Sequence, residues 1–325
     1  MHTTLSPWSA SVRGWVSCVA LLVWVCRPVS AQPPVPAHFV STLHPTTHEL
    51  ILSYDGKRVL TYAFGRDRFK ACVTQLATLD GVPVVRDAPA DHLHHHGLMY
   101  AVKVNGVNFW EEKGDAIGRQ VSDANPQAEW ARTPEGRERI TIRHRLRWEA
   151  PVQGTNIGHL LDENRRLTVT VDPEPGELAI EWESRFEPHR LLRQVQFQGA
   201  DYNGLGLRLP EGFDRVAVFS NASRLPYSEA QTRDVTETAW TAVSGKSDGH
   251  EVMLALAGPV PSAGPAAFFT MRNPFAYLAA TQRLDREPRE VKSGKPIQLH
   301  HLLLVYSSPR GHEALEARFA GWLKP

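Results

Sequence analysis

The sequence predicts an all-β protein, a large antiparallel β-sandwich that ends in one short helix. Short apolar or alternating runs recur along the chain, and turn residues separate them. Asp55-Gly56 and Asn105-Gly106 each stand between two such runs, which favours tight hairpins because primed turns need positive φ at both central residues. A helical repeat of apolar residues stands out only at residues 313–323, near the C-terminus.

The most regular expected strand is 139–148, where Ile140 and Ile142 alternate with threonine and arginine, so that one face is dry. The expected helix carries Leu315, Phe319 and Trp322 on one stripe. The expected strands, in chain order, are 48–54, 58–64, 69–76, 79–85, 98–104, 107–110, 139–148, 166–171, 178–186, 194–198, 205–209, 216–219, 252–257, 266–271 and 296–306.

The N-terminal residues predict a cleaved export signal. An apolar run at 15–25 follows Arg13, and Arg27 ends the run short of the roughly 20 apolar residues that a bilayer-spanning helix needs. Small residues precede the expected cleavage after Ala31. We therefore expect a protein that is periplasmic or secreted, without a membrane span in the mature chain, and divided into a signal peptide at 1–31, a proline-rich leader at 32–37 and a single β-sandwich domain at 38–325.

Net charge and cysteine content bear on which partners and which cross-links the mature chain can have. Residues 1–31 contain two arginines and no acid, so removing them changes the formal charge from +1 to −1. A near-neutral chain offers no steering toward nucleic acid or an anionic membrane. Cys72 would be the only thiol of the mature chain, which excludes an intrachain disulfide.

A block of four histidines at residues 92–96 is the strongest candidate for a site, because titratable and metal-competent groups gather there directly ahead of an expected strand. Successive side chains of an extended chain point to opposite faces. An extended block would therefore place three residues on each face, namely His92, His94 and His96 on one and Asp91, Leu93 and His95 on the other.

We expect His92 and His94 to serve as acid–base groups or as ligands of one divalent metal, with His95 and Asp91 as orienting catalytic partners. Two imidazoles in an H-x-H pair can bind one metal when a distant carboxylate or histidine completes the site. Two alternatives stay open. The histidines could bind substrate without a metal, or form a loop that hydrogen-bonds its own backbone.

Acidic and aromatic residues follow the block. Glu111 and Glu112 could bring a carboxylate near the histidines, with Glu111 as a general base or metal ligand, although adjacent glutamates at a strand end are also typical of a solvated surface. Trp110 is the candidate platform on which a pyranose ring would stack.

A second unusual stretch surrounds Gly204 and Gly206, where glycines permit close backbone approach. Tyr202 and Arg208 are candidates for gripping a polar ligand, with a simple packed strand as the alternative. Asn273, in a turn, is a further candidate for substrate binding. The chain has no G-x-S-x-G, H-E-x-x-H or paired C-x-x-C motif, so serine hydrolases, zincins and zinc ribbons lose support.

These motifs resemble those of an exported bacterial family known as methane oxygenase PmoA-like, whose blocks read D-H-P-H-H-R-G-L, V-N-G-x-x-F-W, Y-x-G-L-x-x-R and N-P-F. Leu93 and His96 depart from the family, which has proline and arginine there. The matching residues are Asp91, His92, His94, His95, Gly97 and Leu98; Val104, Asn105, Gly106, Phe109 and Trp110; Tyr202, Gly204, Leu205 and Arg208; and Asn273, Pro274 and Phe275.

The resemblance implies an uncharacterised family with a galactose-mutarotase-like supersandwich, a fold that serves aldose epimerases, polysaccharide lyases and some glycoside hydrolases. The family name does not carry an activity, because the methane-oxidising subunit spans the membrane several times and this mature chain has no span.

Three functions follow as hypotheses. The first is an exported carbohydrate-processing enzyme that uses the histidine block for epimerisation, elimination or hydrolysis. The second is a non-catalytic carbohydrate-binding protein that holds a sugar or another small polar ligand with the same groups. The third is a metal-dependent oxygenase, which would need a redox metal on His92, His94 and a third ligand.

Overall fold

The computed structural model describes residues 37–151, 158–225, 232–260 and 266–323. The expected signal peptide and all of the leader except Ala37 lie outside the described residues. Residues Ala37–Pro325 form one compact unit. No helix in the described part of the chain is long and apolar enough to cross a membrane.

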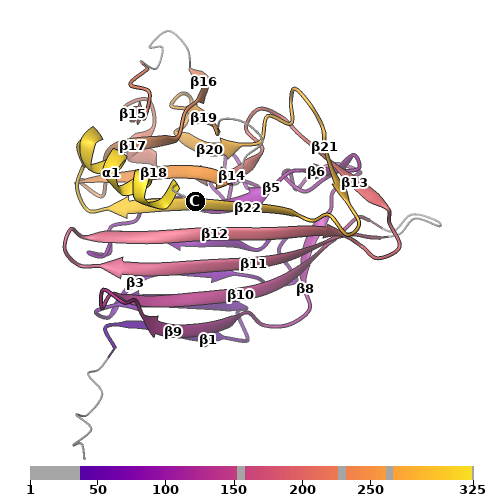
Figure 1. Cartoon of the computed structure of the whole chain (residues 1–325), viewed down its shortest axis with the longest axis horizontal. Helices are drawn as coiled ribbons and strands as arrows, with labels where there is room; N and C mark the ends of the chain where they lie inside the picture. The colour runs from indigo at the N-terminus through magenta and orange to yellow at the C-terminus, as the bar shows by residue number, and fades with distance from the viewer. Residues whose placement is uncertain (1–36, 152–157, 226–231, 261–265, 324–325) are drawn as a thin grey trace, which may run out of the picture. The chain divides into compact units, whose positions relative to one another are not determined.

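Two large sheets dominate the fold, and every pair of named strands is antiparallel (Figure 1). The first sheet has the strand order β1 (Phe39–His44), β2 (Glu49–Tyr54), β3 (Lys57–Ala63), β4 (Cys72–Leu76), β5 (Leu98–Ala101), β14 (Gly204–Arg208), β20 (Tyr277–Thr281), β19 (Ala267–Met271) and β16 (Arg233–Glu237).

The second sheet contains the longest strands, which lie side by side in Figure 1. Its order is β15 (Val218–Asn221), β17 (Trp240–Ser247), β18 (His250–Val260), β22 (Ile297–Tyr306), β12 (Glu177–Pro188), β11 (His159–Asp172), β10 (Glu138–Glu149) and β8 (Arg119–Ser122), with β9 (Gln127–Arg132) also paired to β10.

A small third sheet and two helical segments complete the described fold. The small sheet has the order β21 (Arg289–Lys292), β13 (Gln194–Gln198), β6 (Lys103–Val104) and β7 (Val107–Asn108). A short 3₁₀ helix, η1, spans Glu211–Phe213, and the C-terminal helix α1 spans His312–Leu323. The predicted fold class, an all-β antiparallel sandwich with a short C-terminal helix, is confirmed.

One expected strand is wrong. Residues 79–85 do not form a strand, because the chain turns back on itself immediately after β4. The Gly81 N–H donates to the Thr78 carbonyl at 2.9 Å, and only a single bridge, between Ala77 and Pro83, follows. The strands that the sequence pattern did not predict are β1, β8, β9, β16, β17, β20 and β21.

The main core fills the space between the inner faces of the two sheets. The predicted dry face of β10 is confirmed, since Ile140, Ile142, Leu146 and Trp148 are all buried. His144 shares this face and is held there by polar partners, at 2.9 Å from the Tyr62 hydroxyl and 2.6 Å from the Ser122 hydroxyl. Buried imidazoles tolerate such a core when their nitrogens have partners.

An ion pair lies inside this core. Arg165 and Glu163, both on β11, are fully buried, and Nε of Arg165 donates to Oε1 of Glu163 at 2.7 Å. Further donors reach the same carboxylate, namely Trp148 Nε1 at 2.9 Å and the Ser184 hydroxyl at 2.6 Å. Because both charges are surrounded by hydrogen-bond partners, this pair meets the condition under which buried charges are tolerated.

The outer faces of the two sheets carry separate apolar clusters. On the second sheet, α1 lies beside β17 and β18 (Figure 1). Leu315 and Phe319 of α1 pack against residues of β17, β18 and β22, as the stripe predicted, and Trp322 packs partly against the same cluster. On the first sheet, the outer cluster includes Trp110 and Tyr277. No helix in the described chain packs there, so this face is where a pocket can form.

Candidate functional site

The histidine block folds as a pair of turns. The His92 N–H donates to the Pro89 carbonyl and the His95 N–H donates to the His92 carbonyl, each at 2.9 Å. The block is therefore not extended, and the arrangement that an extended block would give, with His92, His94 and His96 on one face, does not occur. Because the chain turns, His95 joins His92 and His94 at one pocket. His96 does not line this pocket and instead contacts Asp87.

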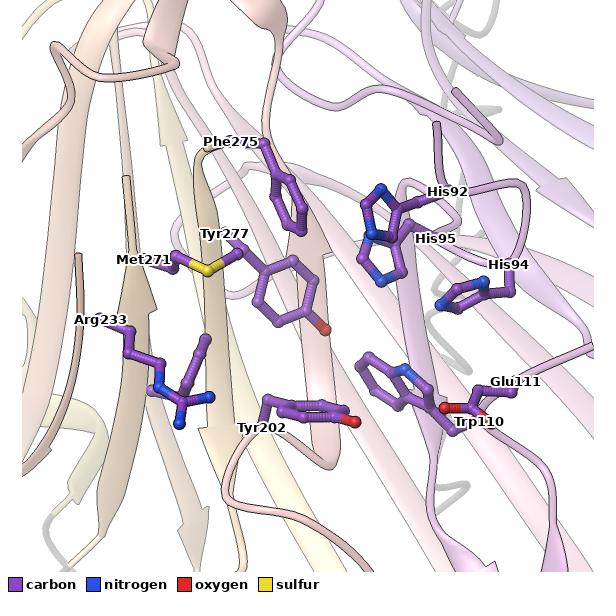
Figure 2. A pocket seen from close by; sticks show the side chains of 11 residues that line it. His92, His94, His95, Trp110, Glu111, Tyr202, Arg233, Met271, Phe275 and Tyr277 are labelled. Atoms are coloured by element: carbon purple, nitrogen blue, oxygen red, sulfur yellow. The ribbon is translucent and has the colours of Figure 1, made fainter. Parts of the chain in front are cut away.

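This pocket lies on the outer face of the first sheet and has a volume of about 300 Å³. In Figure 2 the three histidines occupy one side, Arg233 and Met271 occupy the opposite side, and Tyr277 stands between them. The lining residues are His92, His94, His95, Trp110, Glu111, Tyr202, Arg233, Phe269, Met271, Phe275 and Tyr277.

The three imidazoles are in mutual contact. The rings of His92 and His95 stack with centroids 4.6 Å apart, and the ring of His94 meets His95 edge-on at 4.4 Å. His95 is only 7% exposed, and burial lowers its pKa to about 2. Burial, followed by the charge of Lys70, also lowers the pKa of His94. Both rings are therefore neutral near pH 7, and a neutral imidazole can accept a hydrogen bond.

Two buried polar atoms of the pocket lack partners. Nδ1 of His95 and the hydroxyl of Tyr277 have no hydrogen-bond partner within the described ranges. The Tyr277 hydroxyl points toward the side of the pocket that carries the histidines and Trp110 (Figure 2). Since buried polar groups normally find partners, these two atoms mark a place where a ligand can supply them.

The sequence pattern did not identify Tyr277, but Gly206 was a signal for it. Glycine inside a strand indicates close approach by another group. Gly206 lies on β14 beside β20, and a Cβ added there would collide with the Tyr277 hydroxyl. The predicted close approach at Gly206 is thus confirmed, and it places a tyrosine across the strand.

Aromatic rings and one acid complete the pocket. The ring centroids of Trp110 and Tyr202 are 5.2 Å apart, and Trp110 is only 3% exposed. Glu111 lines the pocket and accepts a hydrogen bond from Asn108 Nδ2 at 3.0 Å. Arg233 comes from β16, a strand that the pattern did not predict, and for that reason sequence reasoning missed it.

Three predicted site residues do not line the pocket. Asp91 lies beside it, 3.1 Å from Nδ1 of His92, as expected of an orienting partner. Arg208 is 1% exposed and lies behind the wall, with its guanidinium carbon 3.7 Å from the centre of the Phe275 ring and Nη2 3.5 Å from Asp91. Asn273 is exposed outside the pocket. Ligand contacts by Arg208 and Asn273 stay predictions.

A buried polar network supports the pocket wall from behind. Nζ of Lys70 donates to the carbonyl of His94 at 3.2 Å, to that of Trp110 at 2.8 Å and to Glu112 at 2.8 Å. Glu112 also accepts from Nε2 of His96 at 2.9 Å. Both glutamates thus lie near the histidine block, since Glu111 lines the pocket and Glu112 contacts His96 behind it. Lys70 fixes two walls of the pocket.

The charges of this network stabilise one another. Burial raises the pKa of Glu112, but the hydrogen bond from His96 and the charge of Lys70 outweigh it and hold that pKa at about 2. Burial likewise lowers the pKa of His96, and the hydrogen bonds to Asp87 and Glu112 reverse this and raise it. The network therefore holds Glu112 ionised beneath the pocket.

Potential metal ligands meet at two places in the described chain. These are Cys72 with Asp87 and His96, and Glu181 and Glu183 with His300. Neither group contains His92 or His94, so a divalent metal on those two histidines stays a prediction.

Fold and site together define an all-β sandwich protein with a small aromatic and histidine-lined pocket on the outer face of one sheet. The chain belongs to the DUF6807 family, a family of unknown function whose model matches residues 49–320. The expected membership of an uncharacterised family is confirmed, and the PmoA-like name stays a prediction. No curated protein matches the sequence significantly.

Solved structures with a similar fold include galactosidases and mutarotase relatives. The galactosidase domain of an α-galactosidase-sucrose kinase matches with a TM-score of 0.50 and 11% identity over 82% of this chain and 42% of that chain. The GH36 α-galactosidase AgaB from Geobacillus stearothermophilus matches with a TM-score of 0.47 and 12% identity, and the match covers 83% of this chain and 41% of that chain. A galactose mutarotase related enzyme from Lactobacillus acidophilus matches with a TM-score of 0.37 and 10% identity, and the match covers 84% of this chain and 99% of that chain.

The chain spans less than half the length of the galactosidases that it matches. At such low identity, the likeness to the first of these structures concerns the fold alone. The function has to be argued from the pocket.

Proposed function

We propose that the pocket binds a single sugar ring and that the protein processes a carbohydrate there. The observation that carries this proposal is the pair of buried polar atoms, His95 Nδ1 and the Tyr277 hydroxyl, that lack partners among the described residues on an otherwise aromatic wall. A ligand with hydroxyl groups would satisfy both. A volume of about 300 Å³ is at the small end for ligand pockets and favours one ring.

The walls suit the two chemical surfaces of a pyranose. A sugar ring has apolar C–H faces and a rim of hydroxyl groups, so it needs aromatic surface and hydrogen-bonding groups together. Trp110 and Tyr202 supply aromatic surface, while the neutral rings of His94 and His95 and the hydroxyl of Tyr277 supply polar groups. That the chain shares its fold with a galactosidase domain is consistent with this ligand class but does not establish it.

Within this proposal the histidines carry the proton transfers. His94 is partly exposed in the pocket and neutral, so it is the candidate base that removes a proton from the sugar. His92 is held by Asp91 at 3.1 Å and is the candidate acid, on the same side of the pocket as His94 (Figure 2). Glu111 is a second candidate for either role. Epimerisation, elimination and hydrolysis all need such a base and acid.

The experiment is to mix the full-length protein with a panel of monosaccharides and glycosides and to follow binding and conversion by NMR. Wild-type protein is expected to bind at least one sugar and convert it. His94→Ala should reduce conversion by about 10²–10⁴-fold, the usual contribution of a general base, while binding persists. Binding without conversion by the wild type would support the carbohydrate-binding alternative, and no binding to any sugar would overturn the proposal.

The oxygenase alternative requires a redox metal on His92 and His94. It predicts iron or copper in protein purified without chelator, lost in the His92→Ala/His94→Ala double variant. Protein that carries neither metal and still binds sugars would count against it.

We also propose that residues 1–31 direct export. The observation behind this is the apolar run at 15–25 with its flanking arginines. N-terminal sequencing of protein recovered outside the cytoplasm should begin at Gln32. Protein outside the cytoplasm with an intact N-terminus would contradict cleavage. Protein found in the cytoplasm alone would contradict export.

A further inference from the structure

Three chemically different donors converge beside the histidine pocket without lining it. Cys72 begins β4, Asp87 lies in the segment between β4 and β5, and His96 stands just ahead of β5. One ligand atom from each, the Cys72 sulfur, a carboxylate oxygen and an imidazole nitrogen, all lie within 4.8 Å of one another. The Cys72 and His96 side chains are both buried, so their positions are fixed by the surrounding fold.

The spacing of these donors is close to what a tetrahedral metal needs. Nδ1 of His96 is 2.7 Å from Oδ1 of Asp87. Around zinc, with metal–nitrogen and metal–oxygen distances near 2.0–2.2 Å, these two atoms would be about 3.4 Å apart. A side-chain shift of under about 1 Å would turn this hydrogen bond into two metal bonds. The Cys72 sulfur, which lies within 4.8 Å of the other two donor atoms, would have to approach to about 3.6 Å to become the third ligand.

The second nitrogen of His96 has the partner that metal-binding histidines usually have. Nε2 lies 2.9 Å from Oε1 of Glu112. A histidine that ligates a metal through one nitrogen commonly donates its other N–H to a carboxylate, which fixes the ring and makes it a better ligand. Glu112 is fixed in turn by Lys70 at 2.8 Å.

A separate cavity reaches this cluster at Asp87, while Cys72 and His96 do not line it. It has a volume of about 570 Å³ and is lined by Asp87 and by residues of β2, β3 and β4, none of which lines the histidine pocket. The cations near this cluster include Lys70, which is paired with Glu112, Arg165, which is paired with Glu163, and Arg68, which lies 3.8 Å from Asp87. Lys70 and Arg165 are thus offset by carboxylates outside the cluster, whereas Arg68 would share Asp87 with the metal.

We propose that Cys72, Asp87 and His96 bind one divalent cation of the zinc type, with the fourth position open toward this second cavity. A sulfur, nitrogen and oxygen donor set suits zinc and related transition metals, whereas magnesium and calcium prefer oxygen alone. The metal would tie the segment that carries Asp87 to β4 and β5, and through Glu112 and Lys70 to the wall of the histidine pocket. This proposal does not depend on the carbohydrate proposal.

The test uses the full-length, untagged chain with Cys18 and Cys26 changed to serine, so that Cys72 is the only thiol. The protein is titrated with Zn²⁺ and with Co²⁺, and bound metal, thiolate-to-cobalt charge-transfer absorption and thermal unfolding are measured. We expect one equivalent of metal, a charge-transfer band and a higher melting temperature when metal is bound.

Variants locate the site. Cys72→Ser should abolish the charge-transfer band. Glu112→Gln should weaken metal binding by about 10–100-fold, the usual effect of removing a carboxylate that holds a metal-binding histidine. His96→Gln removes a ligand itself and should weaken metal binding at least as much. The His92→Ala/His94→Ala double variant is the control for a metal bound by those two histidines, and the charge-transfer band should persist in it. Absence of the band in the protein that carries only the two cysteine-to-serine changes would overturn the proposal, and this result does not depend on whether the other variants fold. So would metal binding that survives Cys72→Ser but is lost in the control.

Discussion

His95 shows how a buried residue links the pocket to stability. Burial, then the charges of His94 and His92, lowers its pKa in the folded protein to about 2 from an ordinary value of 6.5. Below pH 6.5 the unfolded chain takes up a proton that the folded protein does not. His95 therefore lowers the free energy of unfolding as pH falls from 6.5 toward 2.

The corresponding prediction concerns the pH dependence of stability. His95→Phe should reduce the slope of the unfolding free energy between pH 4 and 6 by up to about 1.4 kcal/mol per pH unit, the effect of one proton. Urea unfolding at several pH values measures the slope. The exposed His44→Gln variant is the control. An unchanged slope in His95→Phe would mean that His95 protonates freely in the folded protein.

Gly206 and Tyr277 form a pair whose coupling can be measured. Because an added Cβ at Gly206 would collide with the Tyr277 hydroxyl, Gly206→Ala should destabilise the protein by about 1–3 kcal/mol. Combining it with Tyr277→Phe removes the nearest colliding atom but leaves the Cζ ring carbon at 2.7 Å, so the double variant should recover only part of that loss. Gly311→Ala, where nothing lies within 4 Å, is the control and should change little. Additive losses in the double variant would show that the two residues do not meet.

Residue types could be predicted from the sequence better than their directions. The histidine block, Trp110 and Tyr202 were identified from composition and do line the pocket. Which histidines face it could not be predicted, because the turn at Pro89 to His95 depends on backbone hydrogen bonds that periodicity does not reveal.

Among the elements, α1 has a simple role that the pattern of apolar residues predicted. Phe319 is fully buried, and its ring stacks on Trp240 with centroids 5.7 Å apart. Phe319→Ala should lower the free energy of unfolding by about 3–5 kcal/mol, the usual loss for a buried phenylalanine. Leu191→Ala, at a residue 63% exposed, should change it by under about 0.5 kcal/mol. Denaturant unfolding compares the two, and equal effects would contradict the packing of α1.

Strands with a clean alternation were predicted well, and irregular ones were not. β10 alternates throughout and β13 matches its expected bounds at Gln194–Gln198. β16 and β20 were missed although both carry pocket residues. β20 is buried at every position, so it shows no alternation, and short strands of this kind cannot be recognised from period alone.

At the scale of the whole molecule, the two sheets enclose the charged pair Arg165 and Glu163, and breaking this pair should lower the free energy of unfolding. Arg165→Met leaves Glu163 buried without its cation, which should cost about 3–5 kcal/mol of unfolding free energy. The Arg165→Met/Glu163→Gln double variant should lose less, because no charge is then left alone. Urea denaturation of both variants tests this, and a double variant less stable than the single one would contradict the account.

The fold class could be predicted because many short runs separated by turns admit few architectures. The pocket could not, since its walls come from the turn before β5, from the segment after β7 and from β16, β19 and β20, which only the strand order brings together. Pairing between strands far apart in sequence is information that a single sequence does not display.

The central claim is that a sugar ring occupies this pocket and hydrogen-bonds the free hydroxyl of Tyr277. The most direct measurement is an equilibrium titration of wild-type, Tyr277→Phe and Tyr54→Phe proteins with the sugar found to bind. Tyr54 lies outside the pocket and is the matched control. The account predicts about 5–10-fold weaker binding for Tyr277→Phe alone, the loss of one hydrogen bond. Equal affinity of all three proteins would contradict it.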